Sequence, residues 1–354
     1  MSLGPVMLDV RGPELQRDEI ELLRHPLVGG VILFSRNYEE PGQLRELTRT
    51  IHNLRQPSLL IAVDHEGGRV QRFRDQFTRI PAAGLFGKLF DVDRKKALDY
   101  LTRAGWLLAT ELVAVGIDFS FTPVLDVDSG RSKVIGDRSF HHNTDALVAL
   151  ASACTKGMKS AGMAAVGKHF PGHGHVREDS HETVPIDNRA YQDIMMNDVV
   201  PFERLIRAGI AGIMPAHVIY TAVDSKPAGF SDIWLKQVLR QQLGFQGTIF
   251  SDDINMAGAG PAGNYPERAR AALAAGCDMV LVCNNQPAAI EVIHSLQVEP
   301  YPLLQVRLMR MRADPAQLAF NELKQDQNWQ QTAAVIAALE TTPELDLDDD
   351  AVHT

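Results

Sequence analysis

Cysteine is scarce in this sequence. Its 354 residues include only Cys154, Cys277 and Cys283, an odd number, and no two of them form a CxxC pair. Such a set does not supply a disulfide framework and does not match the spacing of a cysteine-rich metal site. All three lie in apolar segments, which is typical of reduced core residues in a cytosolic protein. We therefore expect a cytoplasmic location.

Long hydrophobic segments are missing too. No stretch approaches the roughly 18 apolar residues that a membrane-spanning helix requires. The first residues do not combine a positively charged segment with an apolar one, so no signal peptide is evident. The sequence therefore predicts no membrane partner.

Basic residues are not in excess either. The formal net charge is −9, and residues 341–354 hold five acids and no Lys or Arg, which leaves −4 for the rest of the chain. A nucleic-acid partner requires a basic stripe, so this balance argues against one. The acidic residues 341–354 also lack hydrophobic periodicity. We expect them to form a disordered tail behind one domain of residues 1–340.

The sequence does contain about eight short apolar segments that alternate with helical patterns. Continuous apolar strands, as opposed to alternating ones, favour a parallel sheet covered by helices on both faces. Eight such units predict a single α/β domain, a (β/α)8 TIM-type barrel, with a doubly wound open sheet as the alternative. The expected strands lie within residues 5–10, 28–34, 58–64, 117–127, 164–166, 211–220, 247–253 and 279–284.

Helices are predicted between these strands from apolar spacing and capping residues. Pro41 opens one of them, with Leu44, Leu47 and Ile51 at helical spacing. Asn143 or Thr144 is the expected N-cap of another that ends near residue 163. Further helices are expected over residues 91–115, 193–208, 232–244 behind Ser231 as N-cap, from about 265 to 276, from about 287, and within 315–340.

The densest group of polar residues directly follows the segment 164–166. Residues 168–181 contain four histidines, one lysine and two acids. Pro171 ends any strand there because it has no N–H to donate to a neighbouring strand. Because α/β folds place their chemistry where strands end, we interpret the loop as part of an active site and not as a merely solvated, His-rich loop. Gly172 and Gly174 suggest hinges on which residues 171–187 move.

Asp179 and His181 are the most informative pair in this loop. A carboxylate two residues from an imidazole can accept its N–H, fix its tautomer and stabilise its protonated form. A general acid/base that works near neutral pH needs these properties. The alternative is a surface contact without a role.

Other polar side chains lie at the ends of predicted strands. In a barrel these ends converge on one face, so the side chains should share a pocket. Asp252 and Asp253 are neighbours in extended backbone and should point to opposite faces, so only one of them should enter that pocket, and the spacing does not say which. The other candidates at strand ends are Asp64, Lys168, His169 and His217.

Three segments resemble bacterial β-N-acetylglucosaminidases of glycoside hydrolase family 3. Lys168-His169-Phe170-Pro171-Gly172-His173-Gly174, followed after four residues by Asp179-Ser180-His181, is similar to the histidine-loop motif of that family. Residues 62–72 are similar to its sugar-binding segment, and residues 250–253 to its nucleophile strand. The resemblance extends from about residue 4 to about residue 310 and is greatest to the single-domain, cytoplasmic, peptidoglycan-recycling enzymes.

This resemblance implies a catalytic barrel without a cofactor or a metal ion. The implied reaction is retaining removal of terminal, non-reducing N-acetylglucosamine from peptidoglycan fragments that carry 1,6-anhydro-N-acetylmuramic acid. It implies Asp252 as the nucleophile, with Asp253 in a supporting role, and His181 oriented by Asp179 as the acid/base. The positions that match sugar-binding residues of the family are Asp64, Arg72, Arg138, Lys168 and His169.

Three other functions are compatible with parts of the pattern. A histidine in place of the second carboxylate would not repel phosphate, which allows a phosphorylase. A metal-dependent hydrolase could draw ligands from His169, His173, His175, Asp179 and His181, although no HExxH motif is present. A sugar-binding protein without turnover would need the same sugar contacts. We expect a saccharide substrate and a monomer or weak oligomer.

Overall fold

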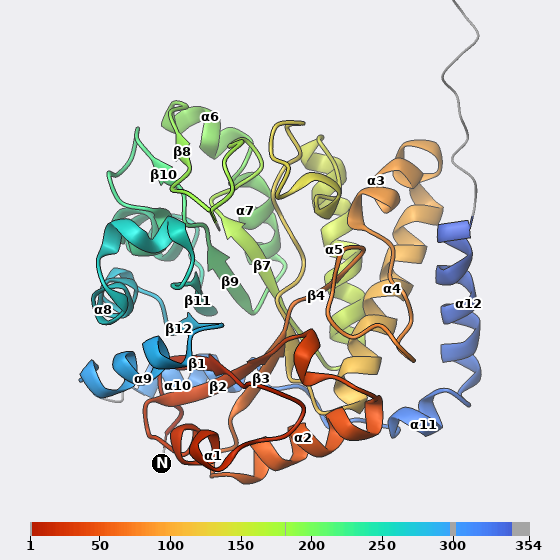
Figure 1. The fold of residues 1–354 in the computed structure, drawn as a ribbon. Helices are drawn as coiled ribbons and strands as arrows, with labels where there is room; N and C mark the ends of the chain where they lie inside the picture. The colour runs from red at the N-terminus through yellow and green to blue at the C-terminus, as the bar shows by residue number, and fades with distance from the viewer. Residues whose placement is uncertain (1, 181, 298–301, 342–354) are drawn as a thin grey trace, which may run out of the picture.

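The computed structural model describes residues 2–180, 182–297 and 302–341. Eight parallel strands close a barrel in the order β1-β12-β11-β9-β7-β6-β3-β2 (Figure 1). The predicted (β/α)8 barrel is confirmed and the open sheet is excluded, because β1 pairs with both β2 and β12. The strands are β1 (Val6–Asp9), β2 (Val28–Leu33), β3 (Leu60–Val63), β6 (Phe119–Ser120), β7 (Ala164–Phe170), β9 (Gly212–Pro215), β11 (Thr248–Asp253) and β12 (Met279–Val282).

Helices surround the barrel on its outer side (Figure 1). The α-helices are α1 (Arg17–Leu23), α2 (Pro41–Asn53), α3 (Ala83–Val92), α4 (Arg94–Ala114), α5 (Thr144–Ser160), α6 (Tyr191–Met196), α7 (Val200–Arg207), α8 (Tyr265–Ala275), α9 (Gln286–Ser295), α10 (Pro302–Met309), α11 (Phe320–Leu323) and α12 (Gln327–Thr341). Short 3-10 turns are η1 (Ser35–Asn37), η2 (Gly136–Arg138), η3 (Ala228–Phe230) and η5 (Ala257–Ala262), and η4 (Ile233–Gln242) is a π-helix.

The barrel interior is filled by side chains from strands that are not neighbours. Phe119 on β6, Phe121 just behind it and Phe250 on β11 are completely buried, and their ring centroids lie 5.2 to 5.3 Å apart. Burial of each such ring stabilises the fold by roughly 1.5–3 kcal/mol. The barrel is therefore a packed core, and any binding site must lie at one of its ends.

Local capping explains where two of the predicted helices begin. Asn143 caps α5 as predicted, since its side chain accepts the N–H of Ala146 at 3.0 Å. The long helix predicted over residues 91–115 is confirmed as α4, which begins at Arg94 because Asp93 leaves the helical conformation and accepts the N–H of Lys96 at 3.0 Å. The first two residues of the predicted range, Asp91 and Val92, belong to the preceding helix α3.

The single helix predicted over residues 193–208 is divided in the structure between α6 and α7. Pro201 occupies the first turn of α7, where its missing N–H cannot continue a helix from α6. Ser231 does accept the N–H of Trp234 at 3.2 Å, as a capping residue would, but the helix behind it has π geometry. Hydrophobic spacing alone did not predict either feature.

Two small pairs of strands extend the C-terminal end of the barrel. The antiparallel hairpin of β4 (His65–Gly67) and β5 (Val70–Gln71) follows β3 directly, and β8 (Ile186–Asp187) pairs with β10 (Ile219–Tyr220). Both pairs lie in the loops that follow barrel strands. They therefore add polar side chains to the end of the barrel where active sites are built.

The C-terminal helix α12 lies beside α4 (Figure 1). The indole N–H of Trp329 donates to the buried carboxyl of Glu111 at 3.0 Å, which ties the two helices together. No helix within the described ranges is both long and apolar enough to cross a membrane. Residues 342–354, most of the predicted acidic tail, lie outside the described residues.

Candidate active site

A cavity of about 830 Å³ opens at the C-terminal end of the barrel strands. Its volume lies within the range usual for small-molecule sites, roughly 300–1,000 Å³. Its wall includes all the described residues that the family resemblance predicts as catalytic or sugar-binding: Asp64, Arg72, Arg138, Lys168, His169, Asp179 and Asp252. His181 lies outside the described residues. The apolar part of the wall comes from Ile32, Phe34, Val70, Val134, Met214, Met256, Leu281 and Cys283.

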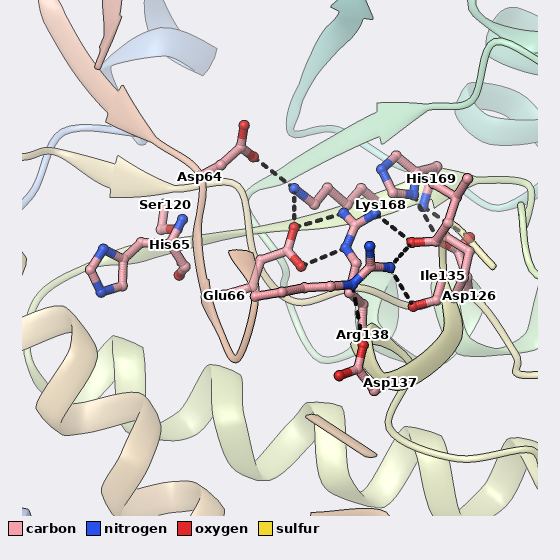
Figure 2. Close-up of polar contacts among 12 residues, drawn as sticks. Asp64, His65, Glu66, Ser120, Asp126, Ile135, Asp137, Arg138, Lys168 and His169 are labelled. Carbon is pink, nitrogen blue, oxygen red and sulfur yellow. Dashed lines mark hydrogen bonds and ion pairs between the residues drawn. The ribbon is translucent and has the colours of Figure 1, made fainter. Parts of the chain in front are cut away.

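Lys168, at the end of β7, is the centre of an ion-pair network in this cavity. Its Nζ lies 2.8 Å from Asp64 and 2.6 Å from Glu66. Glu66 also accepts two hydrogen bonds, at 2.9 and 2.8 Å, from the guanidinium of Arg138. Figure 2 shows Lys168 between Asp64 and Glu66, with Arg138 on the other side of Glu66. Two acids and two bases are therefore fixed in one wall.

The charges of this network are maintained by mutual pairing. Burial by itself would raise the pKa of Glu66, but Arg138 and Lys168 outweigh it and hold the pKa below its ordinary value. Burial would lower the pKa of Lys168, yet Asp64 and Glu66 raise it. Glu66, Lys168 and Arg138 therefore stay ionised at neutral pH, and they present fixed donors and acceptors to a polar ligand.

Glu66 is a site residue that the sequence analysis missed. The hairpin β4–β5 carries it into the cavity directly behind Asp64 and β3. The available signal was its place within residues 62–72, two positions after Asp64 and therefore on the same side of an extended segment. What could not be foreseen was that Arg138, 72 positions further along the chain, would be its partner.

Arg72 completes this side of the cavity. Its Nη2 lies 3.7 Å from Asp64, and its guanidinium carbon lies 5.5 Å from the centroid of the Phe34 ring. The side chain of Asp64 remains 22% exposed between Arg72 and Lys168, so it can reach a bound molecule. A carboxylate between two cations offers acceptors beside donors, which suits sugar hydroxyl groups.

His169 is oriented by a second residue that the sequence analysis missed, Asp126. The Nδ1 of His169 lies 2.7 Å from this completely buried carboxylate, which also accepts the backbone N–H groups of His169 and His173. A carboxylate can only accept, so Nδ1 of His169 carries the proton, and in the neutral ring Nε2 is left as an acceptor. Asp126 is the last residue but one of the apolar segment 117–127, and its place near the end of that predicted strand was the available signal.

Asp252 and Asp253 both line the cavity, so the prediction that their side chains point to opposite faces of the strand, with only one in the pocket, is wrong. The register of β11 against β12 shifts between Phe250 and Asp253, which breaks the simple two-residue period. The carboxyl of Asp253 accepts the N–H groups of Asn255 and Cys283 at 2.9 and 3.0 Å. Burial raises the pKa of Asp253 to about 7 in spite of these bonds.

His217 does not line the cavity. It is completely buried, its ring stacks on Phe230 with centroids 5.1 Å apart, and its Nε2 donates to the carbonyl of Asp253 at 3.1 Å. His217 therefore packs against Phe230 and is bonded to the backbone at the end of β11, and it does not reach the cavity.

The loop after β7 brings Asp179 to the rim of the same cavity. The carbonyl of Asp179 accepts the N–H groups of Glu182 and Thr183 at 3.0 and 2.9 Å, which closes a tight turn. Residues 177–180, Glu182 and Thr183 line the cavity together with Asp252 of β11. Asp179, the predicted partner of the acid/base, and Asp252, the predicted nucleophile, therefore line the same cavity.

The structure gives the glycines of this loop a packing role. A Cβ on Gly174 would lie 1.9 Å from the carbonyl oxygen of Val127, and one on Gly172 would lie 2.6 Å from Cβ of Asp198. Both glycines permit close approach of backbone segments. The hypothesis that residues 171–187 move remains a prediction.

The described part of the chain contains no group of three or more His, Cys, Asp and Glu side chains that could hold a metal ion. The candidate ligands have other partners: His169 is bonded to Asp126, and His173 lies 3.1 Å from the hydroxyl of Ser180. His175 lies outside the cavity wall.

Comparison with known proteins gives consistent matches along the chain. Residues 5–311 match the glycosyl hydrolase family 3 N-terminal domain. A protein of Thioalkalivibrio sulfidiphilus named beta-hexosaminidase is 56% identical over 98% of this chain and 100% of its own length. A beta-hexosaminidase of Nitrosospira multiformis is 54% identical over 96% of this chain and 97% of its own.

A solved structure gives the same picture. The crystal structure of NagZ from Neisseria gonorrhoeae in complex with N-trifluoroacetyl-D-glucosamine superimposes with a TM-score of 0.91 and 46% sequence identity. The match covers 96% of this chain and 98% of that one, so the similarity includes the whole barrel.

Proposed function

The chain belongs to glycosyl hydrolase family 3, and on that premise we propose that it is a retaining exo-β-N-acetylglucosaminidase. Its proposed substrates are peptidoglycan fragments in which N-acetylglucosamine is linked to 1,6-anhydro-N-acetylmuramic acid, with or without a peptide. A cytoplasmic role in the recycling of cell-wall fragments follows from this substrate and from the reduced cysteines.

One observation carries the proposal. A single cavity is lined by Asp252, by Asp179 and by a fixed set of charged groups suited to sugar hydroxyls. Asp64, Arg72, Arg138, Lys168 and His169 supply acceptors and donors on one wall, and an N-acetylglucosaminyl residue bound there would present its anomeric carbon to Asp252.

In the first step Asp252 would attack the anomeric carbon and form a covalent glycosyl-enzyme. Asp253 is less suited to this role because its carboxyl already accepts two backbone N–H groups and burial favours its neutral form. The protonated imidazole of His181, stabilised by the Asp179 carboxylate, would give its proton to the leaving oxygen.

In the second step water would hydrolyse the glycosyl-enzyme. His181 would now be neutral and would take the proton from this water, so that each catalytic group returns to its starting state. The general template for retaining enzymes uses a carboxylate at this place. Because an imidazole does not repel an anion, transfer to phosphate is the second outcome that the assay must separate.

The test is turnover of N-acetylglucosaminyl-1,6-anhydro-N-acetylmuramic acid by the full chain, followed by product identification. We expect free N-acetylglucosamine with the β configuration in the first product, at a rate that is the same with and without inorganic phosphate. N-acetylglucosamine 1-phosphate as the main product would replace the hydrolase by a phosphorylase. No turnover at all would overturn the proposal.

Asp179→Ala is expected to lower kcat on an unactivated phenyl N-acetyl-β-glucosaminide by about 10²-fold, the usual size of a general acid/base contribution. The reason is that His181 would lose the carboxylate that orients it and stabilises its protonated form. The measurement is kcat for phenyl and 2,4-dinitrophenyl substrates, with Glu178→Ala as the matched control on the neighbouring residue. Rates equal to the unmodified enzyme in Asp179→Ala would show that the pair has no role in proton transfer.

A further inference from the structure

Ser180 lies next to Asp179 and has no role in the chemistry proposed above, yet it is only 2% exposed in an otherwise polar loop. Its hydroxyl lies 3.1 Å from Nε2 of His173. Its carbonyl accepts the N–H of Gly258 at 2.9 Å. Both the side chain and the backbone of Ser180 are therefore bonded to parts of the chain outside residues 175–183.

The backbone contact connects Ser180 to the segment behind the proposed nucleophile. Gly258 lies in η5, five residues after Asp253, the last residue of β11. A Cβ on Gly258 would lie 2.9 Å from the carbonyl oxygen of His217 and 3.1 Å from that of Ser180. Only a glycine lets the backbones of η5, of His217 and of Ser180 meet so closely. Because η5 follows β11 directly, the position of Ser180 is coupled to the position of β11.

The side-chain contact connects Ser180 to the sugar-binding wall. The backbone N–H of His173 donates to Asp126 at 2.7 Å, and the same carboxylate holds Nδ1 of His169. A continuous set of hydrogen bonds therefore runs from His169, through Asp126 and His173, to Ser180.

The direction of the His173–Ser180 bond follows from burial. The ring of His173 is buried, which lowers its pKa and favours the neutral form, and its Nδ1 has no partner among the described residues. An unpaired buried N–H costs more than an unpaired lone pair, so the proton belongs on Nε2. The Nε2–H of His173 then donates to the hydroxyl oxygen of Ser180.

We propose that His173 and Ser180 are positioning residues for the proton-transfer step. Their hydrogen bond holds the turn that carries Asp179 on the side of His169 and Asp126, while the Ser180 carbonyl holds the same turn to Gly258 of η5. Together the two bonds set the distance between this turn and Asp252. The inference rests on the proposed function, because it assumes that the turn supplies the acid/base. Small errors of placement in such a pair cost rate even when no reacting group is removed.

Ser180→Ala tests the contact, with Ser180→Thr as the matched variant that keeps a hydroxyl. The measured quantity is kcat/KM, which reports the glycosylation step, for phenyl and for 2,4-dinitrophenyl N-acetyl-β-glucosaminide. We expect Ser180→Ala to lower kcat/KM about tenfold on the phenyl substrate, the effect of one lost hydrogen bond, and less than about twofold on the activated one, which needs little proton transfer. Ser180→Thr should recover most of the loss.

His173→Phe provides an independent variant that keeps a ring of similar size. It should give the same dependence on the leaving group, and the double variant His173→Phe/Ser180→Ala should be no slower than the slower single variant, because both changes remove one bond. Equal losses on the two substrates, no recovery in Ser180→Thr, or losses that multiply in the double variant would each overturn the assignment.

Labelling separates this inference from the proposed function. The unmodified enzyme is treated with a 5-fluoro N-acetylglucosaminyl fluoride and digested, and we expect the label on Asp252. If Asp252 carries no label, the proposed function fails and the inference falls with it. If Asp252 is labelled and Ser180→Ala matches the unmodified enzyme on the phenyl substrate, the inference alone is overturned.

Discussion

Replacing Asp252 by Ala should lower kcat for an aryl N-acetyl-β-glucosaminide by about 10⁴-fold or more, the largest effect expected for any single change in this chain. Three other carboxyls of the described cavity wall already have partners of their own. Asp64 and Glu66 are paired with Lys168, and Asp253 is bonded to backbone N–H groups. The measurement is chromophore release from a 2,4-dinitrophenyl substrate, whose leaving group needs no proton, and kcat/KM is recorded beside kcat because it reports the attack by the nucleophile apart from the later hydrolysis.

Two controls make this result specific. Asp253→Asn keeps an oxygen acceptor for the N–H groups of Asn255 and Cys283, and it should retain activity within about tenfold. Added azide can enter the space left by the Asp252 side chain, and Asp252→Ala should then form the α-glycosyl azide from a β-linked substrate. Substantial activity in Asp252→Ala without azide, or a β-linked azide product, would exclude Asp252 as the nucleophile.

Glu66→Ala is expected to lower the free energy of unfolding by about 3–5 kcal/mol, because it leaves buried charge without its partner. Among the described residues, Arg138 would lose its only carboxylate within ion-pair distance, and Lys168 would be left with Asp64 alone. The free energy of unfolding is measured in urea at neutral pH. In the fraction that stays folded, KM for the aryl substrate should rise, since the wall proposed to bind the sugar loses its fixed geometry.

Glu66→Gln is the matched control. The amide keeps the volume of the side chain and one oxygen acceptor for Arg138, but it removes the charge that balances two cations. We expect a loss of about 1–3 kcal/mol, between the unmodified protein and Glu66→Ala. Equal stability of Glu66→Ala and the unmodified protein would show that water replaces the carboxylate at no cost, and the network would not be a determinant of the fold.

The alternation of apolar strands and helical patterns was sufficient to predict the barrel. Each strand is specified by a short, continuous apolar segment, such as the six buried residues of β2 from Val28 to Leu33. Capping at Asn143 was equally local, because an N-cap depends on one side chain and the N–H three residues ahead. Where a competing local signal existed, as at Pro201, hydrophobic spacing gave a helix that was too long.

The candidate site was predictable where a residue combined a strand end with a recognisable motif. Asp64, Lys168, His169 and Asp252 meet both conditions, and all four line one cavity. His217 meets only the first condition and is packed on Phe230 below β11. A strand end therefore selects candidates, but the direction of the side chain decides among them.

The sequence by itself determined the class of fold, the polar ends of the strands and the family to which the chain belongs, because these depend on residues close together in the chain. Only the tertiary structure decided the pairing of Glu66 with Arg138, the bonding of His169 to Asp126 and the contact of Ser180 with Gly258. Each of these joins residues that lie at the end of, or in the loop after, different barrel strands. Such contacts arise from the closure of the barrel, which brings the ends of its strands together, and no local pattern of residues encodes that proximity.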